Sequence, residues 1–288
     1  MRAGLTSLAA ATARRLPLRA RLLLYRLGPA TGFLRRAINR VVPAGVKPVR
    51  IAAGELEGSW LLLDLQVDKD LWLGSYEPQI AAAIRTFVPQ AGITYDLGAN
   101  VGYTALLLAR ALGPSGQVFA FEPLAANLQR LSRAVALNGL EARITIVPTA
   151  VGAGRGPASF QVHPSGAMGR LQSGAGRADG FVATTTVEVV TLDDFVFAEG
   201  HPPPHVIKMD LEGGEGAALQ GMSRLLRERK PCLLIELHGP QASAEVAAEL
   251  RAARYHIYRM QKGYPEADSI LPHELPRHIV ALASQEAT

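Results

Sequence analysis

The chain has 288 residues, 48% of them hydrophobic and 19% charged, with a formal net charge of +5. This size and composition suit one α/β core with appendages, or two small domains. With Cys232 as its one cysteine, the chain cannot form an intrachain disulfide, which fits a reducing compartment. No run reaches the roughly eighteen apolar residues of a membrane span, so we expect a soluble body.

The excess of positive charge lies at the N-terminus. Residues 1–50 contain ten arginines, one lysine and no acid, whereas the rest of the chain has 19 basic and 25 acidic residues. We expect a partly helical arm, broken at Pro17, that contacts an anionic membrane or an acidic partner, serves as an organelle leader, or packs on the domain. The acidic remainder argues against a nucleic-acid groove. Because the arm lacks the apolar centre of a secretory signal, we expect a cytoplasmic or peripherally membrane-bound protein.

Strands and helices alternate from about residue 92, after a lead-in segment, 51–91, that we expect to pack on the core. Apolar stretches that end in glycine or turn residues predict three strands and two helices, in chain order 93–98 (strand), 103–113 (helix), 117–123 (strand), 124–139 (helix) and 144–151 (strand). This order, with short joints, predicts a parallel sheet covered by helices on both faces.

Residues 152–186 interrupt the alternation. Their first 29 residues, 152–180, contain eight glycines, which predicts a mobile loop or an irregular hairpin that covers the substrate. A strand is then expected within 184–195, where Asp193 and Asp194 form a turn or a helix start. The alternation resumes with the segments 205–213 (strand), 214–229 (helix), 231–239 (strand), 241–253 (helix), 255–261 (strand) and 278–283 (strand).

The first strand of the alternation ends in "DLGANVG", which has the character of a nucleoside-binding turn. Gly98 and Gly102 allow a tight turn and a close approach of a ligand, and Asp96 supplies a carboxylate. A dinucleotide fingerprint would need glycines where Asn100 and Tyr103 stand, and no phosphate-binding Gly-Lys-Ser/Thr follows. A carboxylate in place of phosphate-binding amides favours a cationic or zwitterionic nucleoside.

The second strand ends in an acid, Glu122. A carboxylate at this place in a nucleotide-binding sheet accepts hydrogen bonds from the two ribose hydroxyls. The alternative is a glycine turn followed by an unrelated surface glutamate. The acid, the glycine turn and the alternating pattern together predict a nucleoside site.

Several spaced motifs resemble one family. The segments "WLGSYEPQ", "DLGANVGYT", "AFEP", "VTLDDF", "IKMDLEGGE" and "IELHG", in this order, are similar to those of the FkbM family of class I S-adenosylmethionine-dependent methyltransferases. The resemblance covers roughly residues 55–285 and does not include the arm. It implies a Rossmann-like, mostly parallel seven-stranded sheet with a final antiparallel strand and helices on both faces, in a methyltransferase domain over residues 92–288.

The resemblance also implies a place for the cofactor, S-adenosylmethionine. Asp96, and Glu77 of the lead-in segment, would face its amino-acid end. Gly98, Asn100 and Gly102 would line the methionine and ribose, and Glu122 would bind the ribose hydroxyls. Ala150 and Val151 would lie near the adenine.

Charged residues follow the fourth and fifth strands. Lys208 and Asp210 share one side of a strand and Glu212 continues that side, while Glu236 and His238 share a side of the next strand. We predict Asp210 or His238 as the base that takes the acceptor's proton, with the other three residues positioning it.

Purely structural interpretations of these residues stay open. Lys208 and Asp210 can form a structural ion pair, and His238 can be a satisfied strand-end histidine. Glu215 is interpreted as a carboxylate that complements the dipole of the following helix. Cys232, which opens an apolar strand, is interpreted as a core residue.

The acceptor and the need for a metal are less constrained. Asp210, Glu212, Glu236 and His238 could hold a hard cation, but no compact ligand motif demands one, so we expect transfer without a metal. The fourth strand ends in "DLEG" and not in the Asp/Asn-Pro-Pro-Tyr of many amino-directed methyltransferases, which favours a hydroxyl acceptor.

The resemblance implies O-methylation of a sugar, a glycan or a secondary metabolite. The net charge of +2 in residues 152–180 favours an acidic acceptor. The alternatives are N-methylation of a small molecule, a dinucleotide-dependent oxidoreductase, and a membrane-surface scaffold with an inactive core.

Overall fold

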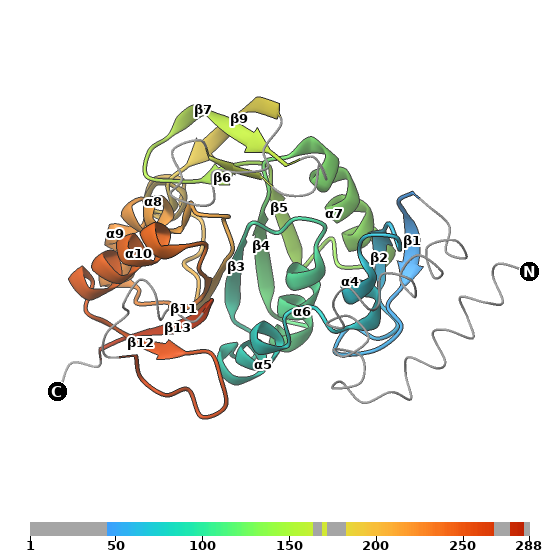
Figure 1. The fold of residues 1–288 in the computed structure, drawn as a ribbon, viewed down its shortest axis with the longest axis horizontal. Helices are drawn as coiled ribbons and strands as arrows, with labels where there is room; N and C mark the ends of the chain where they lie inside the picture. The colour runs from blue at the N-terminus through green and yellow to red at the C-terminus, as the bar shows by residue number, and fades with distance from the viewer. Residues whose placement is uncertain (1–44, 164–168, 172–182, 268–276, 285–288) are drawn as a thin grey trace, which may run out of the picture.

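The structure is a computed structural model that describes residues 45–163, 169–171, 183–267 and 277–284. The N-terminal arm lies outside these residues up to position 44. A β-sheet runs through the middle of the molecule (Figure 1). Its strands are β3 (Ile93–Leu97), β4 (Gln117–Phe121), β5 (Ile144–Val147), β10 (Val206–Met209), β11 (Cys232–Glu236), β12 (Tyr255–Arg259) and β13 (His278–Ala283).

Within the described residues this sheet has seven strands in the order β12-β13-β11-β10-β3-β4-β5. The strands from β11 to β5 pair in parallel, and β13 pairs antiparallel to both β11 and β12. This is the mostly parallel, Rossmann-like sheet with an antiparallel strand near one edge that the sequence predicts. The chain order reverses between β3 and β10, and ligands bind at such a reversal in open parallel sheets.

Helices cover both faces because apolar side chains alternate along the strands. In β4, Val118 and Ala120 join one core cluster, whereas Phe119 and Phe121 join another. The helices of the first face are α5 (Pro78–Phe87), α6 (Tyr103–Leu112) and α7 (Ala125–Leu137), and those of the second face are α8 (Glu215–Gln220), α9 (Ser223–Glu228) and α10 (Pro240–Ala252).

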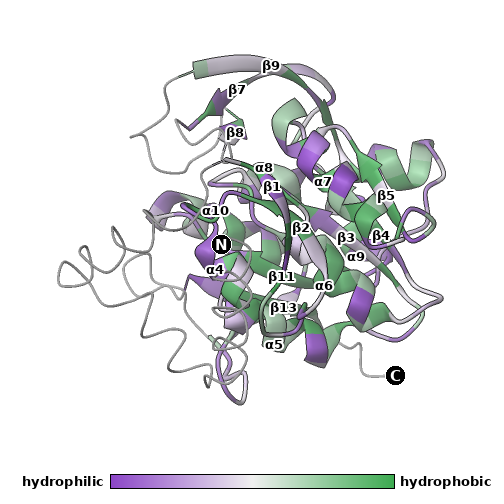
Figure 2. Cartoon of the chain, turned by 90° about the vertical axis from the view of Figure 1, so that its right-hand side faces the viewer, coloured by the Kyte–Doolittle hydropathy of each residue, from purple (hydrophilic) through white to green (hydrophobic). Residues whose placement is uncertain are grey.

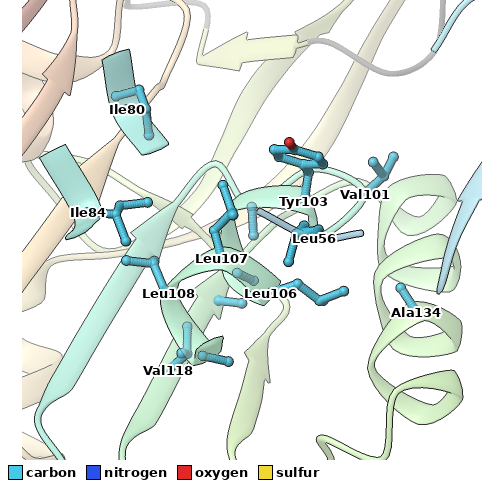
Figure 3. Close-up of a cluster of buried hydrophobic side chains, with 14 of the residues drawn as sticks. Leu56, Ile80, Ile84, Val101, Tyr103, Leu106, Leu107, Leu108, Val118 and Ala134 are labelled. Carbon is cyan, nitrogen blue, oxygen red and sulfur yellow. The ribbon is translucent and has the colours of Figure 1, made fainter. Parts of the chain in front are cut away.

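The core of the first face is built from leucine, isoleucine and valine side chains. Figure 3 shows Ile80 and Ile84 of α5 beside Leu107 and Leu108 of α6, over Val118 of β4. In the hydropathy colouring, β4 and β5 are largely hydrophobic, while polar patches mark the helices outside them (Figure 2). No helix among the described residues is both long and apolar enough to cross a bilayer.

The predicted strand 144–151 is in fact two strands in two sheets. β5 ends before Pro148, which has no N–H to continue a ladder, and the chain then enters β6 (Ala150–Val151). β6 belongs to a four-stranded sheet, within the described residues, of order β6-β9-β7-β8, with β7 (Gly156–Val162), β8 (Gly169–Leu171) and β9 (Ala183–Val190). Within the glycine-rich segment 152–180, β7 pairs antiparallel with β8, which is the hairpin of the two predicted alternatives, and β9 pairs antiparallel with the other edge of β7. Residues 164–168 and 172–182 lie outside the described residues.

The predicted helix 214–229 is likewise interrupted. α8 ends at Gln220 and α9 begins at Ser223. Between them Gly221 approaches Gly152 so closely that a Cβ at Gly221 would lie 2.0 Å from the Gly152 carbonyl oxygen. The carboxylate of Asp193 accepts hydrogen bonds from the backbone N–H groups of Arg224 and Leu225, at 2.9 and 2.8 Å, and so satisfies free donors in the first turn of α9.

The lead-in segment packs beside α7. It contains β2 (Trp60–Leu63), α4 (Lys69–Leu73) and α5, and β2 pairs with β1 (Lys47–Arg50), which lies at the end of the predicted arm. The Asn138 side chain accepts from the Trp60 N–H at 2.9 Å and donates to the Trp60 carbonyl at 2.8 Å. Arg130 of α7 donates to the Leu62 carbonyl and to Asp68. These bonds fix the segment that carries Glu77 against the sheet domain.

Candidate active site

A pocket opens where β3 and β10 lie side by side. Its volume, open mouth included, is about 620 Å³. Seven of the residues predicted from the sequence line it: Gly98, Asn100, Glu122, Ala150, Val151, Asp210 and Glu212. The structure therefore brings the predicted ribose, adenine and methyl ends of the site into one continuous cavity.

Glu122 lines this pocket and is held by hydrogen bonds from its neighbours. Its Oε2 accepts a hydrogen bond from the Asn100 N–H and its Oε1 accepts one from the Leu124 N–H, both at 2.9 Å. The side chain is only 4% exposed, and burial raises the pKa of Glu122 to about 7, against the lowering effect of these bonds. The Asn127 side chain also donates a hydrogen bond to this carboxylate, which leaves about one of its four lone-pair sites for a hydroxyl donor.

The two glycines of the turn serve different purposes. Gly98 has φ +80°, and a Cβ there would lie 2.1 Å from the carbonyl oxygen of Asp210, so glycine is required for the contact between the ends of β3 and β10. Gly102 begins α6 with φ +96° and faces Leu131 of α7, where a Cβ would lie 2.8 Å from Cδ1. Gly102 is not among the residues that line the pocket.

Lys208 is buried between two carboxylates. Its Nζ lies 3.7 Å from Oδ1 of Asp96 and 3.5 Å from Oδ2 of Asp210. Burial alone would lower the pKa of Lys208, but the charges of Asp210 and Asp96 outweigh it and raise that pKa. Asp96 is fully buried within β3 and does not line the pocket, and burial raises its pKa to about 6. The ion-pair interpretation of Lys208 therefore describes the geometry, with Asp96 as a second partner.

His238 is oriented by a residue that the sequence did not mark as part of the site. Nδ1 of His238 lies 2.9 Å from Oε1 of Glu215, which also accepts from the backbone N–H groups of Leu211 and Gly213, at 3.1 and 3.2 Å. Glu215 is fully buried. The interpretation of Glu215 as a residue that only complements the helix dipole is therefore incomplete. Its carboxylate also contacts the imidazole of His238 and stabilises the turn after β10.

The other ring nitrogen of His238 faces acids. Nε2 lies 3.6 Å from Asp210 Oδ1, 3.5 Å from Glu212 Oε2 and 3.6 Å from Glu236 Oε1. Burial lowers the pKa of His238, but the bond to Glu215 and the charge of Asp210 raise it to about 9. Burial also raises the pKa of Asp210, against the opposing charge of Lys208.

Glu236 joins this cluster to a second group of acids and histidine. One of its oxygens accepts a hydrogen bond from Arg277 and the other lies 3.6 Å from Nε2 of His278, which is 4.0 Å from Glu77 Oε1. Burial raises the pKa of Glu77 to about 7. Glu77 lies in this group and not in the lining of the pocket.

The wall near Ala150 and Val151 contains residues that the sequence did not reveal. Phe160 of β7 and Leu171 of β8 line the same pocket. Both are buried, and they form a core cluster with Ala150. The alternation of apolar residues in 156–162 could have indicated a strand with one buried face, but the surrounding glycines obscured this pattern.

Comparison with known proteins identifies the family of the chain. Residues 96–257, more than half of the chain, match the family model described as the methyltransferase FkbM domain. The hexuronic acid methyltransferase AglP of Haloferax volcanii is 25% identical over 210 residues, which are 71% of this chain and 77% of that protein.

Solved structures similar to this chain include the methyltransferase FkbM from Methylobacillus flagellatus KT, at 19% identity and TM-score 0.45, covering 76% of this chain and 54% of that one. An O-methyltransferase from Bacillus cereus, solved in complex with SAH, is 12% identical with a TM-score of 0.44, covering 92% of this chain and 96% of that one. The chain belongs to the FkbM methyltransferase family, a class of enzymes whose usual methyl donor is S-adenosylmethionine.

Proposed function

We propose that this enzyme transfers the methyl group of S-adenosylmethionine to a hydroxyl oxygen of a sugar or glycan. The observation that carries the proposal is the continuous pocket, which joins the ribose-type acid Glu122 to the acids Asp210 and Glu212. The hexuronic acid methyltransferase among the relatives supports an acidic sugar as the acceptor.

The residues present fit S-adenosylmethionine. Glu122, held by Asn100, Leu124 and Asn127, keeps an acceptor site for a ribose hydroxyl, and the buried Oδ1 of Asn100, which has no hydrogen-bond partner among the described residues, is a further acceptor. Ala150, Phe160 and Leu171 form an apolar wall for the adenine. When bound, the cofactor supplies an electrophilic methyl group on a positively charged sulfur.

The carboxylates in and behind the pocket favour the positive charge of the cofactor's sulfur. Asp210 and Glu212 line the pocket, and Glu215 and Glu236 lie behind them against His238. A site so rich in carboxylates attracts a sulfonium and disfavours an acceptor whose reacting atom is itself an anion. A neutral hydroxyl is the acceptor that suits this charge.

A hydroxyl must lose its proton as its oxygen attacks. Of the two predicted bases, Asp210 fits better, because His238, with its pKa raised to about 9, is already protonated near neutral pH. Asp210 is a carboxylate at the pocket wall whose proton affinity is increased by burial. His238, held by Glu215, then orients Asp210 and Glu212 through charge, and Lys208 holds Asp210 from the other side.

The test is a pair of measurements on the purified protein. S-adenosylhomocysteine should bind tightly and NAD should not, because the turn at Asn100 lacks the glycines of a dinucleotide site. Extracts of glycans and small molecules should then be incubated with S-adenosylmethionine and enzyme, with the Asp210→Asn variant as control. A product heavier by one CH₂ group that base treatment does not hydrolyse excludes a methyl ester, and an O–CH₃ signal in its NMR spectrum distinguishes an ether from an N-methyl product.

A further inference from the structure

Three side chains from distant parts of the chain meet at the antiparallel edge of the sheet. Glu77 directly precedes α5, Glu236 ends β11, and His278 begins β13 as the register partner of Glu236. A carboxylate oxygen from each acid and an imidazole nitrogen lie within 4.8 Å of one another. The side chains are 13%, 1% and 12% exposed, respectively.

Each of the three residues presents an unsatisfied polar atom. Glu77 Oε2, Glu236 Oε2 and His278 Nε2 are buried and have no hydrogen-bond partner among the described residues. The separations of 3.6 Å from His278 to Glu236 and 4.0 Å to Glu77 are too long for hydrogen bonds. They are close to the separations of roughly 3–3.5 Å between ligands that each lie about 2.1 Å from one metal ion.

Glu236 is prepared for such a role by its neighbours. Its Oε1 accepts hydrogen bonds from the Arg277 guanidinium and faces His238, which leaves Oε2 directed at His278. Partners of this kind fix the orientation of a metal-ligating carboxylate. Arg277 pairs with Glu236, and His278 in its protonated form pairs with both acids, so a divalent cation bound here would take the place of the imidazole proton.

The neighbouring group of Asp210, Glu236 and His238 also has its ligand atoms within 4.8 Å of one another, but its carboxylates are already engaged. Asp210 is paired with Lys208, and the Glu236 oxygen that faces His238 is the one bonded to Arg277. The donor atoms available to an ion are therefore those of Glu77, Glu236 and His278.

We propose that Glu77, Glu236 and His278 bind a divalent cation beside the methyl-transfer site. Two carboxylates and one imidazole suit Mn²⁺ among the common divalent ions, since carboxylates favour Mg²⁺ or Mn²⁺ and imidazole favours first-row transition metals. Three protein ligands leave coordination positions for oxygen atoms of the acceptor. This proposal differs from the expectation of transfer without a metal and gives Glu77 a role other than contact with the cofactor.

The experiment measures Mn²⁺ binding to the full-length protein by electron paramagnetic resonance, in which bound Mn²⁺ loses its free-ion signal. Wild type should bind about one equivalent. His278→Asn and Glu77→Gln should each weaken binding at least tenfold. His238→Asn, which removes the imidazole of the neighbouring group, should bind as wild type does. An unchanged circular dichroism spectrum and a cooperative thermal transition for each variant show that the fold is intact.

The outcomes separate this inference from the proposed function. Absence of Mn²⁺ binding by wild type, or loss of binding in His238→Asn with retention in His278→Asn, overturns the site. Neither result bears on methyl transfer, because the binding assay contains no acceptor. Conversely, Mn²⁺ binding with the expected variant pattern supports the site even if the acceptor proves not to be a sugar.

Discussion

The Nδ1 atom of His238 lies 2.9 Å from the Oε1 atom of Glu215, which is fully buried at the first turn of α8. Glu215 therefore holds two things at once, the imidazole at the end of β11 and the backbone turn after β10. One carboxylate therefore links the two strand ends that flank the proposed methyl-transfer site.

Replacing Glu215 with glutamine should lower the pKa of His238. The substitution keeps an acceptor for the backbone N–H groups but removes the negative charge that stabilises the imidazolium. We expect a decrease from about 9 by at least one unit, measured by NMR titration of the imidazole. An unchanged His238 pKa in a folded variant would contradict the coupling.

Replacing Asp210 with asparagine should slow the chemical step by about 10²–10⁴-fold while S-adenosylhomocysteine binds nearly as well as to wild type. The amide cannot take a proton, but Lys208 keeps Asp96 as a partner. Single-turnover rates and calorimetric titration measure the two effects. Glu212→Gln, at a more exposed position on the same wall, is the matched control and should have a smaller effect. A wild-type rate in Asp210→Asn would remove this residue from the chemistry.

Cofactor affinity should depend on the ionisation of Glu122. Ribose hydroxyls donate to the carboxylate, so the ionised form binds better, and the pKa of Glu122 in the empty protein is raised to about 7 by burial. The affinity for S-adenosylhomocysteine should increase as the pH rises from 6 to 8. Glu122→Gln should bind more weakly and show little of this pH dependence, whereas its rate once loaded should change far less.

The same group should affect the stability of the empty protein. Because the folded pKa of Glu122 is raised above the unfolded value of 4.5, its contribution is present below that value and is lost as the pH rises through about 7. Glu122→Gln should therefore gain stability relative to wild type between pH 5 and pH 8, on the order of 1–3 kcal/mol. Urea denaturation at several pH values measures this, and a constant difference between the two proteins would refute it.

Gly98→Ala should destabilise the fold more than a left-handed backbone alone explains. The strain of a side chain at positive φ costs roughly 1–2 kcal/mol, and at Gly98 the new Cβ would also meet the Asp210 carbonyl. Gly139 is the matched control, since it has φ +64° and a Cβ added there would have no atom within 4 Å. Denaturation should show the larger loss of unfolding free energy for Gly98→Ala, and equal losses would exclude the steric term.

The parallel sheet was predictable because its strands alternate with amphipathic helices at short intervals. The pocket residues Gly98, Glu122 and Asp210 were predictable for a related reason, since the ends of parallel strands converge at one edge. Glu215 was not, because its contact with His238 depends on how tightly the chain turns after β10. Local sequence does not reveal that turn.

Other features depend on distant pairing. Glu77 and His278 meet only because β13 inserts next to β11, which no local pattern in "HIVALA" indicates. The break at Pro148 was visible in the sequence, but the separate pairing of Ala150 with β9 was not, because it requires the chain to leave one sheet and enter another.

The pairing of β6 with β9 makes the proposed adenine wall and the glycine-rich region parts of one structural module. Insertions or substitutions in this module among relatives would therefore change the affinity for the cofactor together with the preference for the acceptor. Engineering of acceptor range by grafting residues 152–186 should therefore include 150–151, so that Phe160 and Leu171 keep the surface they pack against.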